Sequence, residues 1–304
     1  MKPALSIILF TTLAGAGQGL VVALAIAALA GAAPDARATA GMLWLAAALL
    51  VAALVASFFH LGRPARAWRA AAMWRTSWMS REVIVLPVFI AVTAAWALAG
   101  SRSPALPLLA IALALALWYC TAMIYACIRF IQEWAHPLTV VNYTTLGLAS
   151  GCVLFCAVCF AFGERALAAA AAPWAMGSTA LAWFTRALSL RRNARLKPRS
   201  STQSATGIRG ERVVQRSMGF TGGSFNTREF FHGAALGTLR HARIAFQVLA
   251  FALPLGLVAW GWHAGSGVAL AIAVPVQFAG LLAERWLFFA QARHPQNIYY
   301  QVVS

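Results

Sequence analysis

Residues 57–82, SFFHLGRPARAWRAAAMWRTSWMSRE, form a polar segment between two long apolar runs. The segment holds one His, five Arg, three Trp and one Glu, which places many groups able to bind a polar ligand at the edge of two apolar runs. Pro64 lacks an amide hydrogen and disfavours the helical conformation at the residue before it, so a helix must end close to Gly62. We therefore expect a turn at the edge of an apolar layer, with His60 and Glu82 facing each other across it.

The composition around this segment is that of an integral membrane protein. Of the 304 residues, 62% are hydrophobic and only 10% are charged, whereas a soluble domain is nearer half apolar and a quarter charged. The formal net charge of +17 therefore marks the surface loops of a membrane protein and does not indicate nucleic-acid binding. Since no separate soluble domain is visible, residues 1–304 are predicted to form one membrane domain.

Eight apolar runs are long enough, or nearly so, to cross a bilayer as helices. The first is too long for the apolar region of a signal peptide and is predicted to be retained. Because backbone groups inside hydrocarbon must pair within the protein, we predict an all-α bundle of eight transmembrane helices. The runs are Leu5–Leu29, Gly41–Phe59, Val83–Ala99, Leu106–Ile128, Thr139–Phe162, Leu167–Leu190, Ile244–His263 and Val268–Ala290.

The loops that follow the second, fourth and sixth runs carry most of the arginines, and the other loops are nearly neutral. This alternation predicts that both termini and the basic loops lie on one side. In a bacterial inner membrane the positive-inside rule makes that side cytoplasmic. A basic face is also suited to docking an acidic partner.

The loop between the sixth and seventh runs, residues 191–243, is unusually long and basic. Its centre, residues 220–232, mixes glycines with four phenylalanines. Two interpretations remain open: a basic segment that lies on anionic membrane lipid, or an ordered element that grips a protein partner through aromatic and arginine anchors.

His60 and Glu82 are the candidate catalytic residues. Ionisable residues at membrane depth are functional candidates by default. A histidine takes up a proton near neutral pH and a glutamate relays it to water, which are the requirements of quinol oxidation. The alternatives are structural: His60 as an interfacial residue bonded to backbone, and Ser80 as a helix N-cap with Glu82 in the first turn.

Other polar or sulfur-containing positions have simpler explanations. Tyr125 is either part of an interfacial aromatic belt or lines a ligand site. Gly15 and Gly19 form a small-residue packing face, and Gln18 is expected to bond across helices, with contact to the ligand as the alternative. The cysteines lie in apolar runs, which argues against disulfides, zinc or a cluster, and no two histidines lie at matched depth for a bis-His haem.

These residues resemble the DmsC-like membrane anchor subunit of anaerobic dimethyl sulfoxide reductase. The resemblance rests on the eight runs, the FHLGRP motif at 59–64, Ser80-Arg81-Glu82 and the Met-Ile-Tyr stretch at 123–125. It implies a subunit without its own metal that binds quinol, menaquinol or ubiquinol. His60 and Glu82 would form the quinol-site pair, and Tyr125 would be a further quinol-binding residue.

The resemblance also implies two partners, a four-cluster iron–sulfur subunit and a molybdopterin catalytic subunit. We expect quinol oxidation in anaerobic electron transport, with Arg63 or Arg66 steadying charge on a quinol oxygen. The long loop at 191–243 departs from the shorter connections expected in this family, so a dehydrogenase that feeds the quinone pool is an alternative. A secondary transporter or permease is the leading alternative from another class; its signature would be inverted repeats with broken helices, and no convincing internal repeat is visible. A purely structural anchor is the third possibility.

Overall fold

The computed structural model describes residues 1–59, 61–100 and 103–301, and within these residues the chain is all-helical with no β-strand. Short helical segments connect or follow the long ones. The long helices are α1 (Leu5–Leu29), α2 (Ala36–Phe58), α3 (Trp78–Ala99), α4 (Ala105–Ala126), α5 (Pro137–Ala161), α6 (Arg165–Asn193), α9 (Leu236–Gln247), α10 (Leu253–Ala264) and α11 (Gly267–Ala290). The short segments are η1 (Pro64–Met73), α7 (Thr202–Thr206), η2 (Gly219–Gly223), α8 (Phe225–Glu229), η3 (Val248–Ala252) and η4 (Pro295–Tyr299).

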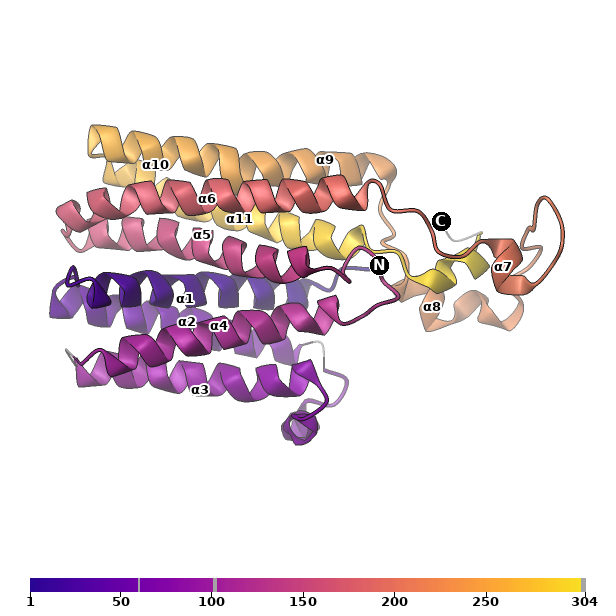
Figure 1. Cartoon of the computed structure of the whole chain (residues 1–304), viewed down its shortest axis with the longest axis horizontal. Helices are drawn as coiled ribbons and strands as arrows, with labels where there is room; N and C mark the ends of the chain where they lie inside the picture. Colours follow the sequence, from indigo (N-terminus) through magenta and orange to yellow (C-terminus); the bar gives the residue numbers. More distant parts are fainter. Residues whose placement is uncertain (60, 101–102, 302–304) are drawn as a thin grey trace.

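Seven helical segments among the described residues are long and apolar enough to cross a membrane. One of them, Gly237–Ala264, contains most of α9 together with the π-turn η3 and α10. The eighth member of the bundle is α6, which lies along α5 and runs through Pro173 without interruption (Figure 1). Its arginines make it less apolar than its neighbours, and it is not among the seven. The prediction of an all-α membrane bundle is confirmed.

Helix α1 lies at the centre of the bundle and contacts α2, α4, α5 and α11. Its crossing with α5 depends on glycine. A Cβ added to Gly19 would overlap the backbone of Gly147, and one added to Gly151 would overlap the backbone of Gly19. Small residues let two membrane helices approach until their backbones touch, which is the packing predicted for Gly15 and Gly19. The same face carries Gln18, whose Nε2 donates to the carbonyl of Ala114 at 3.4 Å, as expected.

Two element boundaries differ from the prediction. Helix α3 begins at Trp78 with Ser77 as its N-cap, so the alternative role proposed for Ser80 is wrong: the hydroxyl of Ser77 accepts from the amide of Ser80. The long loop is also shorter than predicted, because α6 runs to Asn193 and α9 begins at Leu236. A helix satisfies its own backbone hydrogen bonds, so it continues past the point where the apolar pattern ends.

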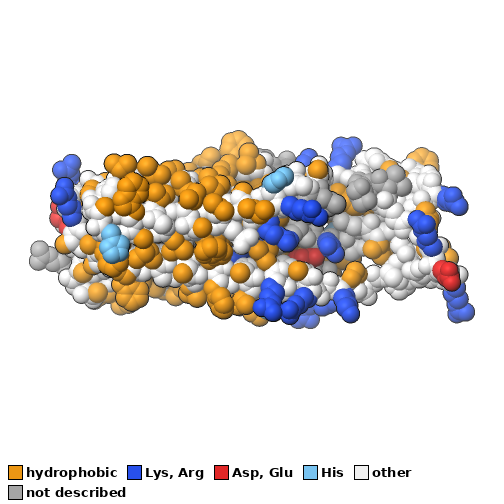
Figure 2. Space-filling view, turned by 90° about the horizontal axis from the view of Figure 1, so that it is seen from above, with side chains coloured by type: hydrophobic (Ala, Val, Ile, Leu, Met, Phe, Trp, Pro, Cys, Tyr) orange, Lys and Arg blue, Asp and Glu red, His pale blue; other side chains and the backbone are white. Residues whose placement is uncertain are grey.

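Both termini lie at one end of the bundle, together with α7 and α8 (Figure 1). Most of the visible lysine and arginine side chains gather toward this end, a smaller charged group lies at the opposite end, and hydrophobic side chains predominate between them (Figure 2). We call this the basic end. Beyond the ends of the long helices, residues 194–235 form what we call the basic arm, which packs on the C-terminal segment 293–301. There the Phe230 ring stacks on His294, with 3.7 Å between ring centroids.

Candidate functional site

The predicted site residues are only partly brought together. His60 lies outside the described residues. Arg63, which precedes η1, and Arg66 on η1 are exposed, and their side chains make no hydrogen bond or ion pair with the described part of the chain. The segment η1 packs on α3. Glu82 lies inside the bundle, and Tyr125 is partly buried in it. The structure therefore provides a buried carboxyl group and an aromatic cluster, with the two arginines on the surface nearby.

Glu82 is buried, with 7% of its surface exposed. Its carboxylate accepts a hydrogen bond from the hydroxyl of Thr121 on α4. The preceding residue, Arg81, points outward instead: it donates to the carbonyls of Trp74 and Arg75 at 2.9 Å. Successive helical residues differ by about 100° in direction, so one turn of α3 presents Arg81 to the surface and Glu82 to α4.

An aromatic pair covers the outer side of this site. The rings of Trp78 and Tyr119 meet edge to face with 5.3 Å between centroids, and the guanidinium of Arg81 lies 4.1 Å from the Trp78 ring. Tyr119 and Met79 are each nearly half exposed on the lipid-facing surface of α3 and α4. A flat, apolar ligand arriving from the membrane would therefore meet aromatic surface before it met the Glu82 carboxyl group.

Tyr125 lies one turn beyond Thr121 on α4, on the same helix face. It stands at the centre of an aromatic cluster that joins α4, α5 and α11 at the basic end. Four rings surround it with centroids 5.3–5.9 Å away, those of Trp134, Tyr143, Phe288 and Phe289. This packing leaves Tyr125 only partly exposed, so most of its ring contacts protein, and a role in an aromatic belt would use only its exposed edge.

A small polar cavity lies next to Thr121, between α1, α4, α5 and α11. Its volume is about 20 Å³, enough for roughly one water molecule. Gln18, Thr121 and Arg285 line it, and so do the indole N–H of Trp118 and the hydroxyl of Tyr143. The last two groups have no hydrogen-bond partner among the described residues. A quinone ring is far larger than this space, so the cavity is suited to water and not to the ligand itself.

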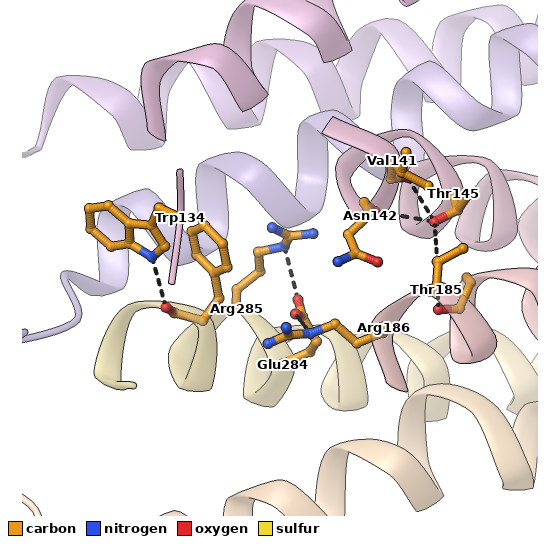
Figure 3. Close-up of polar contacts among 10 residues, drawn as sticks. Trp134, Val141, Asn142, Thr145, Thr185, Arg186, Glu284 and Arg285 are labelled. Carbon is orange, nitrogen blue, oxygen red and sulfur yellow. Dashed lines mark hydrogen bonds and ion pairs between the residues drawn. The ribbon is translucent and has the colours of Figure 1, made fainter. Parts of the chain in front are cut away.

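Three buried charged residues were not recognised from the sequence as a cluster. Arg186 on α6 pairs with Glu284 on α11 at 2.5 Å, and Arg285 pairs with the same carboxylate at 3.1 Å (Figure 3). All three are at most 4% exposed. The Arg285 guanidinium also lies 4.0 Å from the Tyr143 ring. The cluster carries two positive charges and one negative charge, so a net positive charge lies inside the bundle.

The polar side chain of Asn142 on α5 belongs to the same interior region (Figure 3). Its Oδ1 is buried without a hydrogen-bond partner among the described residues, and so is the Nη2 of Arg186. Glu284 and Arg285 were overlooked because a run of apolar residues surrounds them. The sequence does place two charged residues inside the last apolar run, and charged residues within a membrane span indicate a functional site or pairing between helices.

No group of His, Cys, Asp or Glu side chains in the described part of the chain is placed to hold a metal ion. Cys152, Cys156 and Cys159 are unpaired thiols on α5, packed inside the bundle or partly buried. The spacing of these cysteines therefore reflects stacking along one helix.

Comparisons with known proteins agree with this architecture. The chain matches the family described as DMSO reductase anchor subunit (DmsC) over residues 1–290. It is also similar to a sulfite dehydrogenase subunit of Allochromatium vinosum, with 49% identity over 327 aligned positions that cover 100% of both chains.

Proposed function

This chain belongs to the DMSO reductase anchor subunit family, and on that premise we propose that it exchanges electrons and protons with the quinone pool at a site beside Glu82. The resemblance seen in the sequence is thereby confirmed. As a member of this family, the chain is an integral membrane anchor in a molybdopterin oxidoreductase complex, and it associates with the catalytic subunit.

The observation that carries the proposed site is the buried Glu82 carboxyl group, bonded to Thr121 behind the partly buried Trp78 and the nearly half-exposed Tyr119. A carboxyl group at membrane depth is costly unless it has a use. Reduction of a quinone takes up two electrons and two protons, and oxidation of the quinol releases them. Glu82 would pass a proton to or from a ring oxygen, since a positioned acid or base is what each proton transfer requires.

His60 and the two arginines complete the proposed site from the segment that precedes α3. His60 would serve as the second proton-exchanging group, because its ordinary pKa lies near neutral pH. Arg63 and Arg66 would steady negative charge on a ring oxygen. Tyr125 would act from behind Thr121, through the packing of α4, without touching the ring.

The direction of electron flow follows the relative. Since the sulfite dehydrogenase protein is similar over its full length, we infer that the complex oxidises sulfite with water to sulfate and passes two electrons to quinone. The two protons on the quinol come from the aqueous side. The second candidate is the reverse flow, from quinol to dimethyl sulfoxide or a related oxide, which the family description favours.

The arrangement in the membrane follows from charge. By the positive-inside rule, the basic end faces the cytoplasm of a bacterial inner membrane. Since the chain contributes no redox group in this proposal, a four-cluster iron–sulfur subunit would carry electrons between the molybdopterin subunit and the quinone. Glu82 lies in the part of α3 nearest the basic end. A quinone bound there would be close to an iron–sulfur subunit docked on that end.

The test uses the intact complex in membranes, with sulfite-dependent quinone reduction as the measurement. Glu82→Gln keeps the side-chain volume and the acceptor for Thr121 but cannot release a proton. We expect turnover to fall by about a hundredfold, the usual effect of losing one acid or base. Glu164→Gln is the matched control because Glu164 binds the Asp35 amide at the opposite end. Normal turnover in the Glu82→Gln complex would remove the proposed site.

The same preparation separates the two directions. Sulfite with quinone, and quinol with dimethyl sulfoxide, are supplied in parallel. We expect activity with the first pair. Activity with the second pair alone would establish the reductase.

A further inference from the structure

The basic arm, residues 194–235, is a folded element and not an open loop. It is held against the C-terminal segment by contacts made between residues 205 and 230. The amide of Asn226 donates to the hydroxyl of Tyr300 at 3.1 Å, and the hydroxyl of Tyr299 donates to the carbonyl of Ala205 at 3.1 Å. Such contacts fix the shape of the arm before it meets anything else, which lowers the entropy lost on binding.

The arm, with α7 and α8, projects beyond the ends of the long helices (Figure 1). Large apolar side chains are nevertheless exposed on it. Phe220 is fully exposed, Phe225 is 63% exposed and Ile208 is 56% exposed. Exposed apolar groups on the lipid-facing helices have hydrocarbon to contact, but those on the arm do not. Three large exposed apolar side chains on one short folded element, with no hydrocarbon beside them, favour a protein contact surface.

The basic arm also carries a net positive charge. Residues 194–235 contain seven Lys or Arg and two Glu, a net charge of 7 − 2 = +5. The ion pairs found among the described residues are those of Arg186, Glu284 and Arg285 in the bundle interior, so no arm cation is paired there. Arginine and aromatic residues together are the composition of interface hot spots. The arm therefore combines an apolar projection with unpaired positive charge.

We propose that the basic arm is the docking element for the electron-carrying soluble subunit of the complex, whose contact face is acidic around an apolar pocket for Phe220. This inference rests on the proposed function for the identity of the partner. Opposite charge steers the two surfaces together, and the phenylalanine supplies the desolvated anchor. Anionic lipid is the other possible occupant, and the position of the arm beyond the helix ends argues against it.

The test measures how much of the partner protein stays with the chain when the complex is captured from solubilised membranes. Phe220→Ala removes the proposed anchor at a fully exposed position, so the fold of the chain should be unaffected. We expect at least about tenfold weaker retention, as for a hot-spot residue. Trp174→Ala is the matched control, since Trp174 is 77% exposed on α6 in the apolar layer.

Charge is tested separately. The triple change Arg209→Glu, Arg212→Glu and Arg216→Glu should weaken retention and abolish its salt dependence, because that dependence reports attraction between opposite charges. Arg37→Glu, on the exposed start of α2 at the opposite end, is its control. Unchanged retention in both the Phe220 and the triple variants would overturn the proposal.

Two further results keep the outcome decisive. Trypsin cleavage of the arm should be slow in the intact complex and fast after the partner is stripped. Protection that persists in stripped membranes would overturn the proposal, and its loss on transfer to detergent would assign the arm to lipid. Glu82→Gln should retain the partner normally, so failure of the quinone site and failure of the docking element are distinguishable.

Discussion

The carboxylate of Glu82 on α3 accepts a hydrogen bond from the hydroxyl of Thr121 on α4, in the part of the bundle next to the basic end. The pair joins two helices that both face lipid on their outer sides. It also connects the proposed quinone site with the water-sized cavity, because Thr121 lines that cavity. A single hydroxyl group thus separates the surface site from the polar interior.

Loss of this hydroxyl should affect catalysis more than folding. In Thr121→Val the side-chain shape is kept, but Glu82 loses its hydrogen-bond donor, which costs about 1–3 kcal/mol for a buried charged or polar group. We expect at least tenfold slower quinone turnover with the complex still assembled. Thr121→Ser restores the hydroxyl and should recover most of the rate. Equal rates in the Val and Ser variants would show that the hydrogen bond has no part in turnover.

The Arg186–Glu284–Arg285 cluster predicts an unequal effect of two conservative changes. Glu284→Gln leaves two buried guanidinium groups without a counter-charge, a loss of roughly 3–5 kcal/mol for a broken buried pair. Arg186→Gln leaves Glu284 paired with Arg285 and removes the net positive charge. Thermal unfolding in detergent should therefore show a much larger decrease for Glu284→Gln. The opposite order would mean that the cluster is not held by charge pairing.

The α1–α5 crossing predicts strong intolerance at one glycine. A methyl group at Gly151 overlaps the backbone of Gly19, so Gly151→Ala must push two central helices apart. Overpacking typically costs about 1–3 kcal/mol, and a backbone clash lies at the upper end. Gly177→Ala on α6 meets nothing within 4 Å and should be neutral or slightly stabilising. The measurement is the amount and thermal stability of purified protein.

Three histidines at the basic end predict that stability falls on the acid side of neutrality. The Nδ1 atoms of His136, His232 and His294 each accept a backbone N–H, and burial is the main cause that lowers the pKa of each below its usual value of 6.5. The unfolded chain then takes up protons more readily than the folded chain. The contribution of these histidines to the free energy of unfolding is therefore fully present above pH 6.5 and decreases below it. Thermal unfolding at about pH 7.5 and about pH 5.5 measures the effect.

A variant isolates one contribution to this pH dependence. His136→Asn keeps an N-cap acceptor for the start of α5 but does not titrate in this range. We expect it to flatten part of the acid-side decrease while leaving stability near pH 7.5 almost unchanged. An identical slope in the variant would assign the effect to other groups.

The sequence by itself determined the class of the protein, most of its helices and the basic side. Apolar runs of membrane length leave the backbone no alternative to helices, and arginine-rich loops collect on one side of a bilayer. The motif around Glu82 also pointed to the family. These features are local, since each depends on residues within one run or one loop.

Only the tertiary structure decided which polar groups meet. Glu82 and Thr121 are 39 residues apart, and Arg186 and Glu284 belong to helices separated by the whole basic arm. Their partners follow from the rotation of each helix about its axis, which is set by packing such as the glycine contact between α1 and α5. The rotation of a membrane helix cannot be predicted from its apolar sequence, because apolar residues occur both on the face that contacts lipid and on the face that contacts other helices.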